Sequence, residues 1–215
     1  MKSGDVKGII KDTLIIFAIT LVAGGILGFV YELTKEPIAL QQEQAKSKAC
    51  AEVFMEPDEN GELTEDVKLT FSEIPVDEKA SADLTASGYT DAYIDGVYEA
   101  YEENGALYGY VLSVVDTKGY GGNINLYMGV SLDGTVQGIS ILSISETPGL
   151  GMRAEEVLVP QFFNRKADSF TVTKGEPNDS EISAITSATI TSNAVTGGVN
   201  TGLRYFNLIT EGGAN

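Results

Sequence analysis

The sequence predicts an α+β domain carried behind a single N-terminal transmembrane helix. An uncharged apolar run covers residues 13–31, β-rich runs follow one another between residues 91 and 173, and an amphipathic run covers residues 193–208. Because no series of helical patterns alternates with the strands, we expect an antiparallel or mixed sheet rather than a parallel one.

Residues 13–31 form the predicted anchor. As a helix the run would be roughly 28 Å long, about the thickness of the hydrocarbon core of a bilayer. It is long for the apolar part of a signal peptide, so we expect it to be retained. Lys2, Lys7 and Lys11 precede it, and the positive-inside rule then leaves the N-terminus in the cytoplasm. We expect a single-pass protein of the cell membrane whose main domain is extracytoplasmic.

Within the anchor, Gly24 and Gly28 form a GxxxG pair. The pair fits close contact with a helix of another membrane subunit, and it equally fits glycines tolerated in a lone anchor.

The remaining elements follow in order. A polar helix over residues 34–54, with a kink near Pro37, leads into an acidic loop over 55–68. An Asp-Gly turn predicts a β-hairpin. The full set of expected strands is 91–96, 97–102, 108–116, 124–130, 136–143 and 169–173, and the expected helices are 153–159 and 193–208. The last helix presents one apolar face, made of Val195, Val199, Leu203 and Phe206.

Composition excludes several kinds of chemistry. The 215 residues carry a net charge of −17 and include no histidine and one cysteine. This excludes a His-ligated haem or zinc site, a Cys-rich iron–sulfur site and a nucleophile activated by histidine. We predict no catalytic residue and no metal site in the chain, and the acidic balance argues against nucleic acid as a partner. Cys50, the lone cysteine, is predicted to be a buried or indifferent thiol.

A hydroxyl-rich run, Thr186-Ser187-Ala188-Thr189-Ile190-Thr191, precedes the closing helix. The small Ala188 leaves the hydroxyl of Thr189 approachable, and the helix start beyond it offers free N–H groups and a positive dipole end that suit a phosphate. The alternative is a Ser/Thr-rich strand that runs into a helix cap at Ser192 or Asn193.

A second notable run is Glu146-Thr147-Pro148-Gly149-Leu150-Gly151, which follows the apolar residues 138–145. It is either a loop whose glycines let the backbone approach a flat ligand or a routine Pro-Gly turn. The same stretch fits GxGxxA, the fingerprint of dinucleotide-binding folds. Pro148, Pro160 and the lack of following βαβ units argue against that alternative.

Together with the glycine-rich turn at residues 119–122, these runs resemble the FMN-binding domain family. That family includes the G subunit of the Rnf electron-transport complex and the C subunit of the sodium-pumping NADH:quinone reductase. The order and spacing of the three elements fit over roughly residues 90–208. In two places the chain departs from the family pattern: Ser187 stands where glycine is usual, and Ser183 where aspartate is common.

The resemblance implies a cofactor and its site. FMN would be joined through a phosphoester to Thr189, with Ser187, Ala188 and Thr191 around the attachment point. Glu146, Thr147, Gly149 and Leu150 would lie beside the flavin ring. The chain would then divide into a cytoplasmic tip and anchor (1–33), a helical and acidic connecting region (34–90) and an FMN-binding domain (91–215).

The resemblance also implies a function. The chain would be a membrane-anchored electron-carrier subunit, the redox subunit of an ion-translocating ferredoxin:NAD oxidoreductase of the Rnf type. Its partners would be the other subunits, the membrane and, during maturation, a flavin transferase. Two alternatives stay open: a subunit of the quinone-reductase type or another flavinylated respiratory surface protein, and an anchored extracellular binding module without a cofactor.

Overall fold

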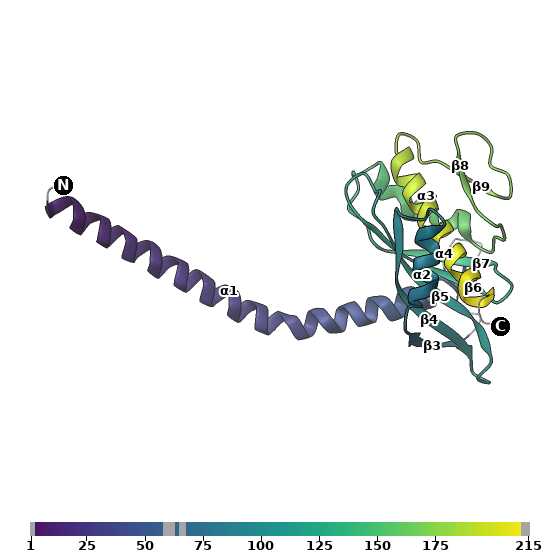
Figure 1. The fold of residues 1–215 in the computed structure, drawn as a ribbon, viewed down its shortest axis with the longest axis horizontal. Coiled ribbons are helices and arrows are strands. Elements are labelled where there is room, and N and C mark those ends of the chain that lie inside the picture. Colours follow the sequence, from purple (N-terminus) through teal and green to yellow (C-terminus); the bar gives the residue numbers. More distant parts are fainter. Residues whose placement is uncertain (1–2, 58–62, 65–67, 212–215) are drawn as a thin grey trace. The chain divides into compact units, whose positions relative to one another are not determined.

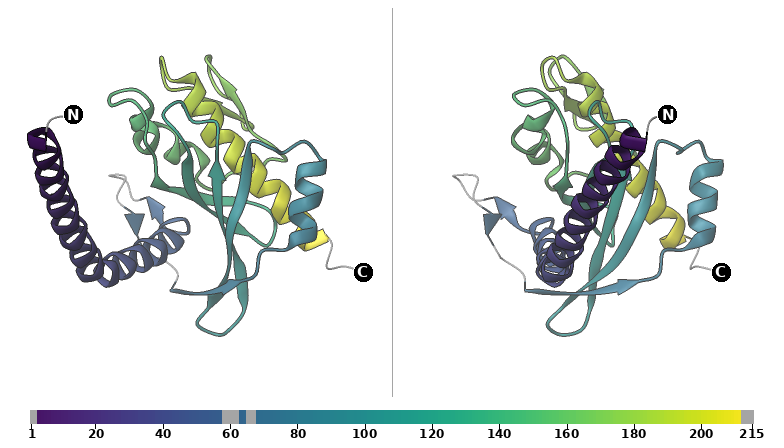
Figure 2. Two further views of the ribbon diagram at one scale, coloured as in Figure 1. Left: turned by 60° about the vertical axis from the view of Figure 1, so that its left-hand side comes forward. Right: turned by 90° about the vertical axis from the view of Figure 1, so that its left-hand side faces the viewer.

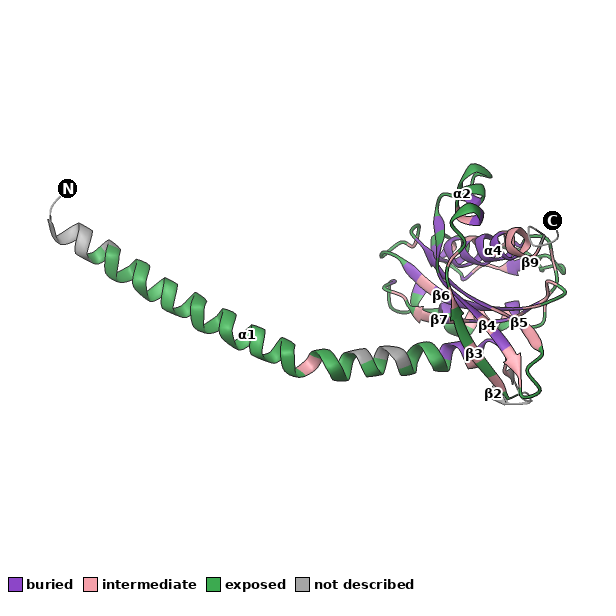
Figure 3. Cartoon of the chain, turned by 60° about the horizontal axis from the view of Figure 1, so that its bottom comes forward, coloured by how far each residue is buried: buried purple, intermediate pink, exposed green. Residues whose placement is uncertain are grey.

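The computed structural model describes residues 3–57, 63–64 and 68–211. The chain forms two units, Met1–Ala45 and Lys46–Asn215. The first unit consists of most of helix α1 (Ser3–Glu52), in which Ile10–Ile38 is long and apolar enough to cross a membrane. Large apolar side chains stand exposed along this segment, most of which is drawn in green in Figure 3. Pro37 lies inside α1, so the helix continues past the anchor as the sequence predicts.

The second unit is built on a five-stranded sheet (Figure 1). Its strands, in spatial order, are β3 (Leu69–Ile74), β4 (Ala92–Glu102), β5 (Leu107–Asp116), β6 (Ile124–Ser131) and β7 (Val136–Ser143). Every neighbouring pair is antiparallel. The α+β class is therefore confirmed, and so is the hairpin from β6 to β7. Its turn contains Gly134 at φ +84°, a conformation that glycine adopts at little cost.

Two helices cover one face of this sheet. Helix α4 (Thr189–Glu211) crosses the strands (Figure 2), and α2 (Glu78–Ala86) packs beside it. The apolar face predicted for the closing helix is buried, and it packs with alternate residues of the central strands, among them Val114, Leu126 and Met128. A Cβ built on Gly202 would lie 2.5 Å from the Cε of Met128, so α4 approaches β6 closely at this glycine.

The other face of the sheet is covered by the end of α1 and the residue that follows it. Ala49, Cys50 and Val53 pack with Tyr98, Val111 and Tyr127 in a second apolar cluster. The prediction that Cys50 is buried is confirmed. Burial raises the pKa of its thiol to about 12, with a smaller contribution in the same direction from the charge of Glu73.

Short elements connect the larger ones. They are β1 (Glu56–Pro57), β2 (Leu63–Thr64), the 3-10 helix η1 (Gly151–Arg153), α3 (Ala154–Val157), the 3-10 helix η2 (Val159–Phe162), β8 (Thr171–Thr173) and β9 (Glu181–Ser183). Strands β1 and β2 pair within the stretch expected to be a loop over 55–68, the rest of which lies largely outside the described residues.

Two element predictions need correction. The two strands expected at 91–96 and 97–102 are one strand, β4, with a register shift between Ile94 and Gly96. Gly96 interrupts the apolar alternation, so a bulge in this strand resembles a turn in the sequence. The closing helix begins at Thr189 rather than Asn193, although Thr and Ser are weak helix formers. Burial of Thr191 and Ser192 overrides that propensity.

Candidate functional site

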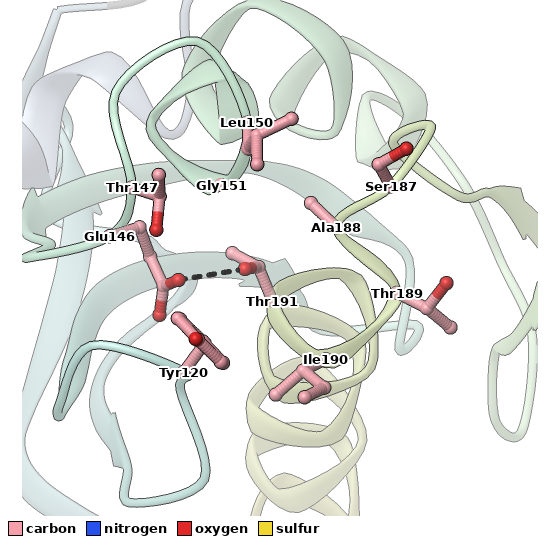
Figure 4. Close-up of a pocket in the computed structure, with 10 residues that line it drawn as sticks. All are labelled: Tyr120, Glu146, Thr147, Leu150, Gly151, Ser187, Ala188, Thr189, Ile190 and Thr191. Carbon is pink, nitrogen blue, oxygen red and sulfur yellow. Dashed lines mark hydrogen bonds between the residues drawn. The ribbon is translucent and has the colours of Figure 1, made fainter.

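The site lies at one end of the sheet because the strands are antiparallel. Asp116 at the end of β5 pairs with Ile124 at the start of β6, and Asn125 pairs with Ser143 at the end of β7. The loops 117–123 and 144–150 therefore leave the sheet at the same end. Both loops and the start of α4 contribute to a pocket of about 520 Å³, which is within the usual size range of small-molecule sites (Figure 4). The lining residues are Tyr120, Glu146, Thr147, Leu150, Gly151, Ser187, Ala188, Thr189, Ile190 and Thr191.

A tight turn shapes the upper wall of the pocket. The carbonyl oxygen of Thr147 accepts hydrogen bonds from the N–H of Leu150 at 3.1 Å and of Met152 at 3.3 Å. Gly149 has φ +76° and follows Pro148, the residue pattern of a type II turn. The Pro-Gly pair thus makes a turn, and that turn holds the side chain of Leu150 over the pocket.

The segment before α4 is fixed by one buried hydroxyl. Ser192 Oγ accepts a hydrogen bond from the N–H of Ile185 and donates one to the carbonyl oxygen of Ala188, each at 3.0 Å. Between these anchor points Ser187 has φ +66°, in the left-handed region that favours glycine. Glycine, the usual residue here in the family that the sequence resembles, adopts this backbone conformation at little cost.

Helix α4 begins in the pocket wall. Its hydrogen-bond ladder starts with the N–H of Ser192 and the carbonyl oxygen of Ala188 at 3.0 Å. The N–H groups of the first helical residues, Thr189 to Thr191, consequently have no partner within the helix. Thr189 is half-buried, and its side chain points away from Glu146 and Thr191 (Figure 4). A hydroxyl beside orphan N–H groups at a positive dipole end is suited to carry a phosphate.

Glu146 lines the pocket and is 7% exposed. Thr191 Oγ1 donates a hydrogen bond to its Oε2 at 3.0 Å (Figure 4), and the N–H of Gly121 donates one to its Oε1 at 3.1 Å. One carboxyl group thereby ties together the glycine-rich loop, the loop after β7 and the first turn of α4.

The pocket brings together every site residue predicted from the sequence except Gly149, which shapes the turn without lining the cavity. Tyr120, Gly151 and Ile190 line it in addition. Tyr120 was missed although it lies inside the glycine-rich run, because no local pattern shows that its side chain reaches the pocket. The GxGxxA stretch begins on a turn after an antiparallel strand and continues through η1 into the four-residue α3. It therefore lacks the βαβ context of a dinucleotide site.

Fold and site together define a small α+β domain with a pocket for a small molecule, in a chain with a helix able to cross a membrane. A family model described as FMN-binding domain matches residues 119–204, a range that contains all the pocket residues. A second, described as RnfG N-terminal region, matches residues 1–53.

Known proteins match this chain over different lengths. The crystal structure of NqrC from Shewanella oneidensis superposes with a TM-score of 0.44 at 20% identity, covering 54% of this chain and 61% of that one. The G subunit of the proton-translocating ferredoxin:NAD(+) oxidoreductase complex of Clostridium ljungdahlii is 46% identical over 98 residues, which are 45% of this chain and 53% of that protein. The G subunit of the Na(+)-translocating ferredoxin:NAD(+) oxidoreductase complex of Acetobacterium woodii is 32% identical over 211 residues, 96% of each chain. On this full-length match, the chain belongs to the family of the G subunits of ion-translocating oxidoreductase complexes.

Proposed function

We propose that this chain is a membrane-anchored electron-carrier subunit that holds FMN through a phosphoester to Thr189. The observation that carries the proposal is the position of the Thr189 hydroxyl. It stands at the start of α4, beside the pocket, within the segment that the FMN-binding domain model matches. A covalent tether also answers a retention problem, because a chain of net charge −17 attracts a phosphate-bearing ligand poorly.

The residues present fit an FMN group. The orphan N–H groups at the start of α4 would hold the phosphate oxygens, and the pocket walls would hold the flat ring against Leu150 and Tyr120. Gly149 would let the backbone turn at φ +76°, and Thr147 would offer polar atoms to the ring edge. FMN, when bound, supplies the redox chemistry, so the protein needs no catalytic residue of its own.

Names of the relatives point to the larger assembly. We infer that the chain serves an ion-translocating ferredoxin:NAD(+) oxidoreductase complex of the Rnf type, with the other subunits as its partners. In the phosphoester the FMN phosphoryl group replaces the hydrogen of the Thr189 hydroxyl, so that the chain gains the mass of FMN less water, and we assign this attachment to a flavin transferase.

The membrane arrangement completes the proposal. Residues 1–33 would form the cytoplasmic tip and anchor, with Lys2, Lys7 and Lys11 keeping the N-terminus inside. Residues 34–90 would connect to the FMN-binding domain at 91–215, outside the cytoplasm. Strand β3 and helix α2 lie in the connecting stretch and also complete the sheet and core of the second unit.

Mass spectrometry of the full chain, extracted from its native membrane, tests the proposal. We expect the intact mass to exceed the sequence mass by that of FMN less water, and peptide mapping to place the addition on Thr189. The Thr189→Val variant should keep its circular dichroism and lose covalent flavin fluorescence. Thr186→Val, a control at an exposed hydroxyl of the same run, should stay flavinylated. An addition found on Thr186 or Thr191, or none at all, would contradict the proposal.

A further inference from the structure

Glu146 is a buried carboxylate held by neutral hydrogen-bond donors. Among the residues that the structure describes, none of the ion pairs includes it. Its two recorded hydrogen-bond donors, Thr191 Oγ1 and the N–H of Gly121, are neutral groups. A buried carboxylate without a cation is costly, because neutral donors replace only part of its hydration. The free-energy cost of burying this charge suggests that the charge has a role in function.

Two glycines, Gly119 and Gly151, lie where the backbone approaches the side chain of Glu146. A Cβ built on Gly119 would lie 2.8 Å from Oε1 and would also clash with the carbonyl oxygen of Gly122. A Cβ built on Gly151 would lie 2.7 Å from Oε2. Real Cβ atoms essentially never approach a neighbour below 3.0 Å, so only glycine fits these two positions with the carboxylate in place. A Cβ on Gly151 would also lie 2.5 Å from Thr191 Oγ1, so both glycines let the backbone pack closely around the carboxyl group and its neighbours.

The carboxylate also lies in the pocket wall. It is the only charged side chain among the ten that line the cavity, and none of the other nine is Lys or Arg. Its negative charge is therefore uncompensated by the wall at the place where the flavin ring is proposed to bind. Charges in a low-dielectric pocket interact much more strongly than the same charges in water.

We propose that Glu146 is a positioning residue that fixes the pocket and places a negative charge beside the bound flavin, which lowers the reduction potential of that flavin. The proposal rests on the proposed FMN site. Reduction adds an electron to the ring, from a reduced redox centre of the proposed oxidoreductase complex or, in the test below, from dithionite, and the side chains of this protein are neither oxidised nor reduced. Added negative charge near a fixed carboxylate is disfavoured, so the carrier gives up its electron more readily.

Glu146→Gln isolates the charge from the hydrogen bonds. Glutamine is nearly isosteric, its amide oxygen can accept from the N–H of Gly121, and its NH₂ can donate to Thr191 Oγ1, which also serves as an acceptor. The matched control, Thr191→Val, removes the hydroxyl donor and keeps the charge. Both variants are made in the full chain, purified in detergent from the native host, and titrated with dithionite while the visible flavin spectrum is followed.

We expect Glu146→Gln to shift the midpoint potential to a more positive value, with flavin stoichiometry and circular dichroism as in the wild type. Thr191→Val, which keeps the charge, should lower the unfolding temperature and should show no positive shift of the midpoint potential. An unchanged midpoint in Glu146→Gln would overturn the proposal. So would a Glu146→Gln chain that fails to fold or to take up flavin, because the charge would then be a structural requirement. The intact mass of the wild type is measured first. If it lacks the added FMN, the FMN proposal itself fails; if it carries FMN, the outcomes above concern Glu146 alone.

Discussion

Gly151 and Thr191 lie next to each other in the wall of the pocket. A Cβ built on Gly151 would lie 2.5 Å from Thr191 Oγ1, closer than a real side chain can approach. The backbone at the start of η1 is therefore packed directly on the first turn of α4. Gly151 is needed here for space, since its φ is not in the left-handed region that Gly149 occupies.

Gly151→Ala should accordingly destabilise the domain by about 1–3 kcal/mol, the usual cost of forcing a methyl group into a packed site. The methyl group would push Thr191 away from Glu146 and break the 3.0 Å hydrogen bond between them. Urea unfolding of the detergent-solubilised chain measures the loss. Gly175→Ala is the control, because a Cβ there would lie 3.7 Å from its nearest neighbour. A similar stability in both variants would show that the loop yields easily.

Ser187 supports a second prediction, which concerns backbone strain. At φ +66° a β-branched residue is disfavoured, so Ser187→Val should lower the unfolding free energy by about 1–2 kcal/mol. Ser187→Gly should stay within about 1 kcal/mol of the wild type, because relief of strain is offset by a more flexible unfolded chain. Thermal unfolding compares the two variants. Equal stability of the valine and glycine variants would mean that Ser187 is not held in this conformation.

Much of the fold could be predicted because its signals are local. The Asp133-Gly134 turn between two apolar runs fixes the hairpin of β6 and β7, and the apolar stripe of α4 repeats at the helical period. Strand β3 and helix α2 could not be predicted in this way. Strand β3 has no fully buried residue, and α2 buries only Ala80 and Leu84, so neither leaves a clear apolar pattern. Both are held mainly by long-range pairing and packing.

The site likewise has residues that local sequence patterns predict and contacts that only the folded chain creates. Thr189 and the loop at Glu146 could be found because their short runs are distinctive. The hydrogen bond from Thr191 to Glu146 joins residues 45 positions apart, and no local pattern encodes such a contact. The part of the site that depends on tertiary packing, including Tyr120 on a neighbouring loop, required the structure.

Leu150 carries a prediction about the cofactor pocket. Its side chain lines the pocket and is 38% exposed, so little fold stability depends on it. If the flavin ring packs on it as proposed, Leu150→Ala should shift the visible flavin spectrum and the midpoint potential while covalent attachment persists. Leu132→Ala, at an exposed leucine of the β6–β7 turn, should change neither. Absorption spectra and redox titrations of both variants test this prediction. A Leu150→Ala spectrum identical to that of the wild type would mean that the flavin ring does not pack on Leu150.

Cys50 should be chemically inert in the folded protein. The thiol is buried against the sheet, and burial raises its pKa to about 12, so the reactive thiolate is scarce at pH 8. A maleimide reagent should leave the native chain unlabelled and label it once after denaturation, which intact mass can count. Rapid labelling of the native protein would mean that the end of α1 readily leaves the sheet.

Asp116 should make stability depend on pH. It is 2% exposed at the end of β5, and burial raises its pKa from the ordinary 3.8 to about 6. The N–H of Lys118 donates to its Oδ1 at 2.7 Å and offsets part of that rise. The charge of Asp91 raises the pKa further, and the charge of Lys118 lowers it. Because the folded-state pKa lies above the unfolded one, the protonated form favours folding. Its stabilising contribution is complete below about pH 4 and is lost as the pH rises through about 6.

Asp116→Asn removes this titration and keeps an oxygen that can accept from the N–H of Lys118. Its unfolding free energy relative to the wild type should therefore rise between pH 4 and pH 7 by about 2–3 kcal/mol, at about 1.4 kcal/mol for each unit of pKa difference. Urea unfolding at several pH values in that range measures the difference.

The control is Asp133→Asn in the β6–β7 turn. Hydrogen bonds, first from Ser131, lower the pKa of Asp133, so its stabilising contribution is lost only as the pH falls below the usual aspartate range. The Asp133→Asn difference should thus stay flat between pH 5 and pH 7. A flat Asp116→Asn difference over the same range would mean that the Asp116 carboxylate is adequately solvated in the folded domain.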